Sequence, residues 1–184
     1  MSEEYLDIVD ENGKLTGERE LRSVCHAKGL WHRTVRIYLF RKRDDEVELL
    51  IHSFLIKRKA NPNMWTASFG GHIKSGSTAE ESIITELKEE INLNPEIRNL
   101  IKGFDTRFCI SYDSIVNHEY TSIFYLPYDD DIEKLIFNDD EIQQVKWSSL
   151  EQIEKAIINN PTRWYIKTAD LLLIKSDLLE KISA

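Results

Sequence analysis

A glycine-bearing loop followed by a short amphipathic helix, in residues 71–93, constrains the fold of this chain more than any other segment. Apolar residues recur there at the one-, three- and four-residue spacing that puts side chains on one face of a helix: Ile83, Ile84, Leu87 and Ile91. The helix begins at a capping box, with either Ser77 or Thr78 as the N-cap residue and a glutamate three positions later. The segment therefore predicts a helix that packs on a core and receives a glycine loop at its N-terminus.

Three glutamates lie on the face of this helix beside the apolar one. Glu86, Glu89 and Glu90 are three and four residues apart, and like charges at these spacings repel each other. A cation among them would remove the repulsion, and Mg²⁺ commonly binds one or two carboxylates together with substrate phosphates. The alternative is a solvated acidic face, which is common in a chain with 32 acidic residues. The glycine loop in front of the helix favours the metal site.

The same segment resembles the Nudix box. In that pattern Gly is followed by five residues, Glu, seven residues and then Arg-Glu-hydrophobic-x-Glu-Glu-x-Gly-hydrophobic. The matching residues in this chain are Gly71, Glu86, Leu87, Glu89, Glu90 and Leu93. The resemblance implies a hydrolase of diphosphate linkages that uses a divalent metal.

Three positions depart from the pattern. Ser77 replaces Glu, Thr85 replaces Arg and Asn92 replaces Gly. In the family the first Glu and the Arg mainly brace the loop against the helix, so here we expect weaker hydrogen bonding between two hydroxyl residues. Asn92 adopts the left-handed C-cap conformation almost as well as Gly does. The metal-binding acids are thus kept, whereas the bracing pair is not.

Other segments resemble the isopentenyl-diphosphate isomerase-like branch of the Nudix family, and they lie in residues 6–13, 29–35, 62–66 and 71–73. True isomerases hold a second metal with three histidines and two glutamates. By position, His32 and His72 match two of those histidines, and His26 is one residue away from the third. Glu119 matches one glutamate, and Asn117 stands where the other is expected. The resemblance leaves open whether these side chains form a second metal site.

One position argues against isomerase activity. Isomerases use a cysteine and a glutamate for proton transfer at carbon, and Gly70 occupies the position of that cysteine. Glycine has no side chain that could donate or accept a proton, which this chemistry requires. We therefore expect an isomerase-like Nudix hydrolase.

The predicted elements give an α/β (α+β) fold in which a mixed sheet lies between helices. Extended segments are expected at 5–10, 15–17, 34–41, 47–54, 65–73, 100–112, 119–128 and 141–147. Helices are expected at 19–28, after the glycine loop, at 149–159 and at 164–182. The resemblance implies a Nudix-type α/β/α sandwich. We expect one domain over residues 1–184, with a core at about 31–160 and additions at both ends.

Composition excludes several classes of protein. The net charge of −8 and the isoelectric point near 5.2 argue against nucleic acid as a partner, because such proteins need a basic surface. We expect no signal peptide, because the first residues are acidic and form no apolar run, and no segment approaches the ~20 apolar residues of a membrane span. Cys25 and Cys109 do not make a disulfide framework, and we expect both to be buried. We therefore expect a cytoplasmic protein that does not bind membranes.

The functional expectation is a pyrophosphohydrolase acting on acid anhydrides, with a small-molecule diphosphate such as a nucleoside diphosphate derivative as its substrate. Glu86 and Glu90 would bind Mg²⁺ or Mn²⁺ with the Gly71 carbonyl, while Glu89 would bind a further ion through water or act as the base. Glu119 is a further candidate ligand or base. The candidate substrate-binding residues are Gly70, Gly71, His72 and Arg58.

Two alternatives remain open. One is a weakened Nudix-fold module that binds nucleotides, which the departures at Ser77 and Thr85 favour, and the other is an isomerase. The leucine-rich C-terminal helix is expected to pack either on its own core or on a second copy in a homodimer.

Overall fold

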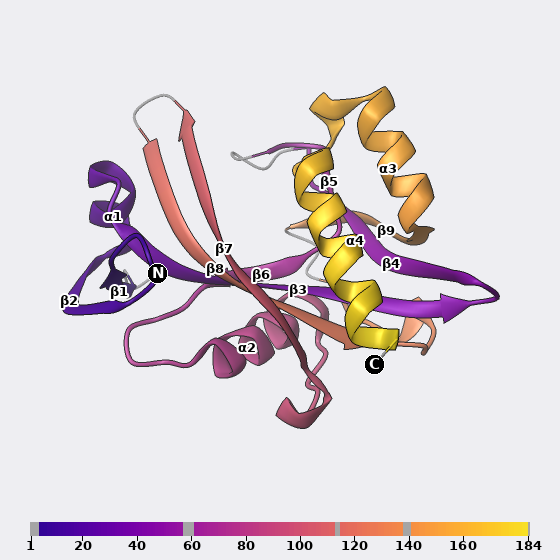
Figure 1. The fold of residues 1–184 in the computed structure, drawn as a ribbon, viewed down its shortest axis with the longest axis horizontal. Helices are drawn as coiled ribbons and strands as arrows, with labels where there is room; N and C mark the ends of the chain where they lie inside the picture. Colours follow the sequence, from indigo (N-terminus) through magenta and orange to yellow (C-terminus); the bar gives the residue numbers. More distant parts are fainter. Residues whose placement is uncertain (1–3, 57–60, 113–114, 138–140, 184) are drawn as a thin grey trace.

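The computed structural model describes residues 4–56, 61–112, 115–137 and 141–183, and its ribbon is shown in Figure 1. The strands are β1 Tyr5–Val9, β2 Leu15–Leu21, β3 Trp31–Arg43, β4 Glu46–Phe54, β5 Trp65–Thr66, β6 Phe69–His72, β7 Ile101–Tyr112, β8 Ile115–Pro127 and β9 Ile142–Ser149. The helices are α1 Arg22–Lys28, α2 Ala79–Ile91, α3 Leu150–Asn159 and α4 Thr168–Ser183. Short 3₁₀ turns lie at Ile97–Asn99, Ile132–Lys134 and Pro161–Arg163.

Strand β3 is the centre of the mixed sheet. One edge of β3 pairs with β8 in parallel, from Trp31 opposite His118 to Phe40 opposite Pro127. The other edge pairs in turn with β1, β6 and β4, all antiparallel. Outside these, β2 pairs with β1, β7 with β8, and both β5 and β9 pair with β4. The expected mixed sheet is confirmed.

The two faces of the sheet are covered by different helices (Figure 1). Alternate residues of a strand point to opposite faces. Ile37 and Leu39 of β3 belong to the core under α2, together with Ile83, Leu87 and Ile91 of that helix. Tyr38 and Phe40 belong to the core under α3 and α4. A strand that is buried on both sides needs apolar residues at successive positions, and the run from Ile37 to Phe40 provides them.

Helix α2 has the ends that its sequence predicts. Thr78 is the N-cap, its hydroxyl accepts from the Glu81 N–H, and the Glu81 carboxylate accepts from the Thr78 N–H. The choice between Ser77 and Thr78 is thus settled in favour of Thr78. Asn92 adopts the left-handed conformation at φ 53°, as expected for a residue in the place of a C-cap glycine.

Several boundaries differ from the expected ones. Residues 19–21 extend β2, because they pair with β1 (Leu21 opposite Tyr5), so α1 begins only at Arg22. Strand β8 begins at Ile115, since it continues its pairing with β7 to the end of that hairpin. Helix α4 begins at Thr168, because the residues before it pair with β5 through the Trp65–Trp164 bridge.

The C-terminal helix packs on its own core. On α4 itself, Leu171, Ile174 and Leu178 are buried, whereas Leu172, Leu173 and Leu179 are exposed. None of the helices in the described part of the chain is both long and apolar enough to cross a membrane. Cys25 is buried as expected, but Cys109 is exposed, as are Asp105 and Arg107 at alternate positions of the same strand.

Candidate metal and substrate site

The acidic face of α2 lies beside the strand that carries the glycines. Glu86 and Glu90 are partly buried, whereas Glu89 is exposed to solvent. The apolar neighbours of these residues on α2, Ile83, Leu87 and Ile91, are fully buried and fix the rotation of the helix. The three carboxylates do not converge on one point, which agrees with the repulsion between like charges on neighbouring turns.

Glu86 packs directly on Gly71. A Cβ atom at Gly71 would lie 2.4 Å from Oε1 of Glu86, so only glycine leaves room for the carboxylate at this position. Burial and the charge of Glu89 raise the pKa of Glu86 to about 7, although the Lys74 ammonium opposes this shift. A buried carboxylate with an acidic neighbour is stabilised when a cation binds. Gly71, Glu86 and Glu90 carry carbonyl and carboxylate oxygens, which are the ligand types that a hard divalent ion such as Mg²⁺ prefers.

A cavity of about 200 Å³ opens next to these residues. Its lining includes Gly70, Gly71, His72, Glu90 and Glu119, which are five of the residues that the sequence singles out. Arg36, Phe54 and Tyr165 line it as well. The cavity thus brings together one carboxylate of the acidic helix, the glycine strand and a cationic side chain.

Gly70 has a structural reason to be glycine. Its φ is +144°, and a Cβ atom there would lie 2.1 Å from the carbonyl oxygen of Val35. Residues with a side chain rarely adopt that conformation, and the contact is with backbone that cannot move aside. A cysteine at this position is therefore incompatible with the present pairing of β6 and β3.

Three histidines from separate elements meet beside Gly71. His26 of α1, His32 of β3 and His72 of β6 each offer a ring nitrogen, and these atoms lie within 4.8 Å of one another. Nε2 of His26 is 3.2 Å from Nε2 of His72. Within the residues that the structure describes, this is the one group of three or more His, Cys, Asp or Glu side chains that converges in this way. The one-residue offset of His26 in the sequence does not keep it away from the other two.

The histidine cluster is neutral and suited to a transition metal. Burial lowers the pKa of His26 and His32, and it lowers the pKa of His72 to about 2. His32 is completely buried, and its Nδ1 donates to the Leu30 carbonyl at 2.8 Å. That tautomer leaves a lone pair on Nε2, a buried atom that has no hydrogen-bond partner. Neutral imidazoles with a fixed tautomer are the usual nitrogen ligands of Zn²⁺ and similar ions.

Glu119 lies in the middle of β8, so its expected place at the start of a strand is wrong. It is only 6% exposed and sits opposite His32 in the pairing of β8 with β3. Its Oε1 accepts from the Asn117 side chain at 2.6 Å, and its Oε2 accepts from Nη2 of Arg36 at 3.2 Å. Glu119 is therefore a held and buried carboxylate on the cavity wall.

The sequence prediction missed Arg36 and Tyr165. The Arg36 guanidinium stacks 4.1 Å above the Phe108 ring, and its Nη2 also contacts the Tyr165 hydroxyl at 3.4 Å. Tyr165 reaches the cavity because its N–H donates to the carbonyl of Trp65 at 2.9 Å. An arginine between the fully buried Val35 and Ile37 is the one signal that could have drawn attention to position 36. Arg58, a candidate for substrate binding, lies outside the described residues.

Comparisons with known proteins agree with this arrangement. A family model described as the NUDIX domain matches residues 30–168. An uncharacterised Nudix hydrolase of Clostridium acetobutylicum is 34% identical over 124 residues, and the match covers 61% of this chain and 59% of that relative. The isopentenyl-diphosphate Delta-isomerase of Salmonella arizonae is 26% identical over 162 residues, or 88% of this chain and 85% of the isomerase.

The fold is also similar to that of solved structures. A crystal structure from Deinococcus radiodurans superposes with a TM-score of 0.67 at 23% identity, covering 94% of this chain and 98% of the other. This similarity confirms the expected α/β/α sandwich.

Proposed function

The chain belongs to the NUDIX domain family, and we propose that it is a metal-dependent hydrolase that cleaves a diphosphate linkage in a nucleoside diphosphate derivative or a related small molecule. The observation that carries this proposal is the Glu86 carboxylate packed on Gly71, next to the cavity that Glu90 and Arg36 line. Carboxylates and a guanidinium that line one cavity suit a diphosphate bound through a divalent ion.

In this proposal Glu86, Glu90 and the carbonyl of Gly71 hold Mg²⁺ or Mn²⁺. The bound ion neutralises phosphate charge and lowers the pKa of a coordinated water. Glu89 is exposed to solvent at the edge of the carboxylate face, where it accepts a proton from the attacking water or holds a further ion through water. Glu119 is the second candidate for the base, although its hydrogen bonds from Arg36 and Asn117 favour a positioning role.

In the same proposal, Arg36, Phe54 and Tyr165, which also line the cavity, bind and orient the substrate. Arg36 offers donors to a phosphate or to a polar group beyond it, and Glu119 and Phe108 hold its guanidinium in place. Phe54 and Tyr165 form an edge-to-face aromatic pair on the same wall, with ring centres 6.3 Å apart. Such a wall suits a planar group of the substrate.

The test is product release from a panel of nucleotide, nucleotide-sugar and prenyl diphosphates in the presence of Mg²⁺, with phosphomonoesters, phosphate and pyrophosphate separated by ion-exchange chromatography, because cleavage inside a nucleotide-sugar gives two phosphomonoesters. Glu90→Gln keeps the shape of the side chain but removes its charge, and we expect it to abolish most of the release while the protein stays folded. The matched control is Glu80→Gln, a substitution in the first turn of the same helix, which we expect to leave release unchanged. Undiminished turnover in Glu90→Gln would contradict the metal assignment.

The histidine cluster and the isomerase relative favour a second candidate, isopentenyl-diphosphate isomerase activity. Gly70 argues against it, because no acid or base is available at that position. Proton NMR of isopentenyl diphosphate incubated with the enzyme separates the two reactions, since isomerisation moves the double bond and hydrolysis releases phosphate. A nucleotide-binding module without activity would give neither product but would still bind nucleotides.

A further inference from the structure

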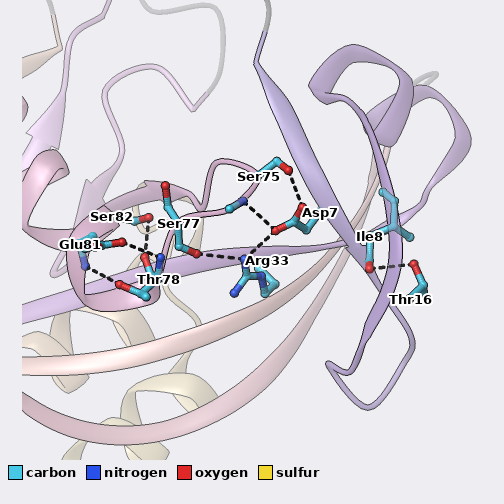
Figure 2. Close-up of polar contacts among 10 residues, drawn as sticks. Asp7, Ile8, Thr16, Arg33, Ser75, Ser77, Thr78, Glu81 and Ser82 are labelled. Atoms are coloured by element: carbon cyan, nitrogen blue, oxygen red, sulfur yellow. Dashed lines mark hydrogen bonds and ion pairs between the residues drawn. The ribbon is translucent and has the colours of Figure 1, made fainter.

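The loop between β6 and α2 is held by residues that lie outside the glycine loop and the acidic helix. Figure 2 shows the Asp7 carboxylate of β1 and the Arg33 guanidinium of β3 next to each other beside this loop. Oδ1 of Asp7 accepts from the Ser75 hydroxyl at 2.6 Å, and Oδ2 accepts from the Gly76 N–H at 3.1 Å. Both oxygens of one carboxylate are thus used on successive residues of the loop.

Arg33 completes the arrangement. Its Nη2 donates to Oδ2 of Asp7 at 3.0 Å and to the Ser77 carbonyl at 3.1 Å (Figure 2). The Asp7 and Arg33 side chains are only 18% and 20% exposed. Their charges are therefore weakly screened by solvent, unlike those of an ordinary surface ion pair. We call Asp7 and Arg33 the loop clamp.

The backbone supports the loop clamp from the same two strands. The Ser75 N–H donates to the Tyr5 carbonyl at 2.8 Å, and the Ile73 N–H donates to the Arg33 carbonyl at 3.0 Å. Burial alone would raise the pKa of the Asp7 carboxyl, but the hydrogen bonds from Ser75 and Gly76 and the charge of Arg33 outweigh it and lower that pKa. The contacts thus stabilise the ionised form of Asp7.

The pair that braces this loop in the common Nudix pattern is missing here. Ser77 and Thr85 stand at the two positions, and the Thr85 hydroxyl donates to the Glu81 carbonyl within its own helix at 2.9 Å. The expected hydrogen bonding between the two hydroxyl residues is therefore replaced by a contact inside α2. Ser77, Thr85 and Glu86 line a cavity of about 60 Å³ between the loop and the helix. Longer side chains at positions 77 and 85 would extend into that space.

We infer that Asp7 and Arg33 are positioning residues that replace the missing pair. They hold the loop on the opposite side from α2, so that the loop keeps Gly71 in register with the Glu86 carboxylate and with Glu90. Residues that orient metal ligands from outside typically change metal affinity by about 10- to 100-fold when they are mutated. The inference rests on the proposed function, because the metal is what Glu86 and Glu90 would bind.

The test measures metal binding without turnover. Mn²⁺ is titrated into the protein and the free ion is followed by electron paramagnetic resonance, at a temperature well below the melting point. Binding that Glu90→Gln removes is assigned to α2, which separates it from any ion on the histidine cluster. We expect Asp7→Asn to raise the Kd of that site by about 10-fold.

Two further variants separate positioning from stability. Asp10→Asn is the matched control, because Asp10 lies in the same hairpin but its carboxylate accepts from the backbone N–H groups of Asn12 and Lys14 within its own turn. It should leave the Kd unchanged. Arg33→Lys keeps the charge but loses the planar guanidinium that donates to both Asp7 and Ser77. It should therefore raise the Kd as Asp7→Asn does. If Asp7→Asn does not fold, Arg33→Lys replaces it in the test.

The most discriminating measurement is whether restoring the common pair recovers metal affinity in the Asp7→Asn protein. Ser77→Glu with Thr85→Arg restores the common pair and fills the 60 Å³ cavity. We expect this pair of substitutions to recover most of the Mn²⁺ affinity lost in Asp7→Asn. It should add little affinity in the wild-type protein, because the effects of two contacts that hold the same loop are not additive.

The outcomes separate the inference from the proposed function. A folded Asp7→Asn protein with the wild-type Kd would overturn the inference, as would an equal gain from the restored pair in both backgrounds. If the wild-type protein shows no Mn²⁺ binding that Glu90→Gln removes, the proposed function fails and the inference fails with it.

Discussion

Replacement of Gly71 by alanine tests the geometry of the metal site directly. The added Cβ would lie 2.4 Å from Oε1 and 2.7 Å from Cδ of Glu86. Carbon and oxygen atoms in contact are about 3.3 Å or more apart, so the carboxylate has to move by about 1 Å. A misplacement of about 1 Å costs roughly 100-fold in rate. We therefore expect Gly71→Ala to lower kcat/KM by about that factor.

The same substitution should barely affect stability. Gly71 lies outside the left-handed backbone region, and the atoms in its way belong to the end of a flexible side chain. The unfolding free energy should therefore change by less than about 1 kcal/mol. Gly70→Ala is the neighbouring control, since its φ of +144° and its contact with the Val35 carbonyl predict a loss of about 1–3 kcal/mol. Urea unfolding and steady-state kinetics measure both effects, and a fully active Gly71→Ala enzyme would refute the position assigned to Glu86.

Three other substitutions give measurable effects. Arg36→Met leaves the buried Glu119 carboxylate without its cation and should cost about 3 kcal/mol in urea unfolding, partly recovered when Glu119→Gln is added. Asn92→Ala should lower the melting temperature by an amount equivalent to about 1 kcal/mol, whereas Asn92→Gly should not, because position 92 is left-handed. Asp7→Asn should lower stability at pH 7, and the difference should disappear as the pH falls below 3.8, the ordinary pKa of Asp, because the folded-state pKa lies lower still. Unfolding midpoints measured from pH 7 to pH 2 check this last expectation.

The sequence predicted those parts of the site that depend on local chemistry. The ends of α2 follow from Thr78, Glu81 and Asn92, which act within one turn of the helix. The placement of Glu86 with Gly71 at one site follows from their spacing in the Nudix box. The strand boundaries were less accurate, since pairing with a neighbouring strand extended β2 and β8 beyond their own patterns.

Contacts between distant segments were not predictable from the sequence. Tyr165 and Arg36 meet across 129 positions, and the bridge between Trp65 and Trp164 brings the segment before α4 to the cavity. The histidine cluster was uncertain for a similar reason. Gly29 ends α1 in the left-handed conformation, and the following turn sets where His26 points relative to β3. The number of residues between His26 and β3 does not reveal the change of chain direction at Gly29.

The alternation of side chains along strand β3 assigns its residues to two different parts of the candidate site. Its even-numbered residues His32, Thr34 and Arg36 serve the histidine cluster, Glu119 and the cavity, while the odd-numbered Arg33 and Val35 serve the loop clamp and the core under α2. A single inserted or deleted residue would exchange the two sets, because successive side chains point to opposite faces. Length changes in relatives of this chain should therefore collect in the turn after β3 and spare the strand itself.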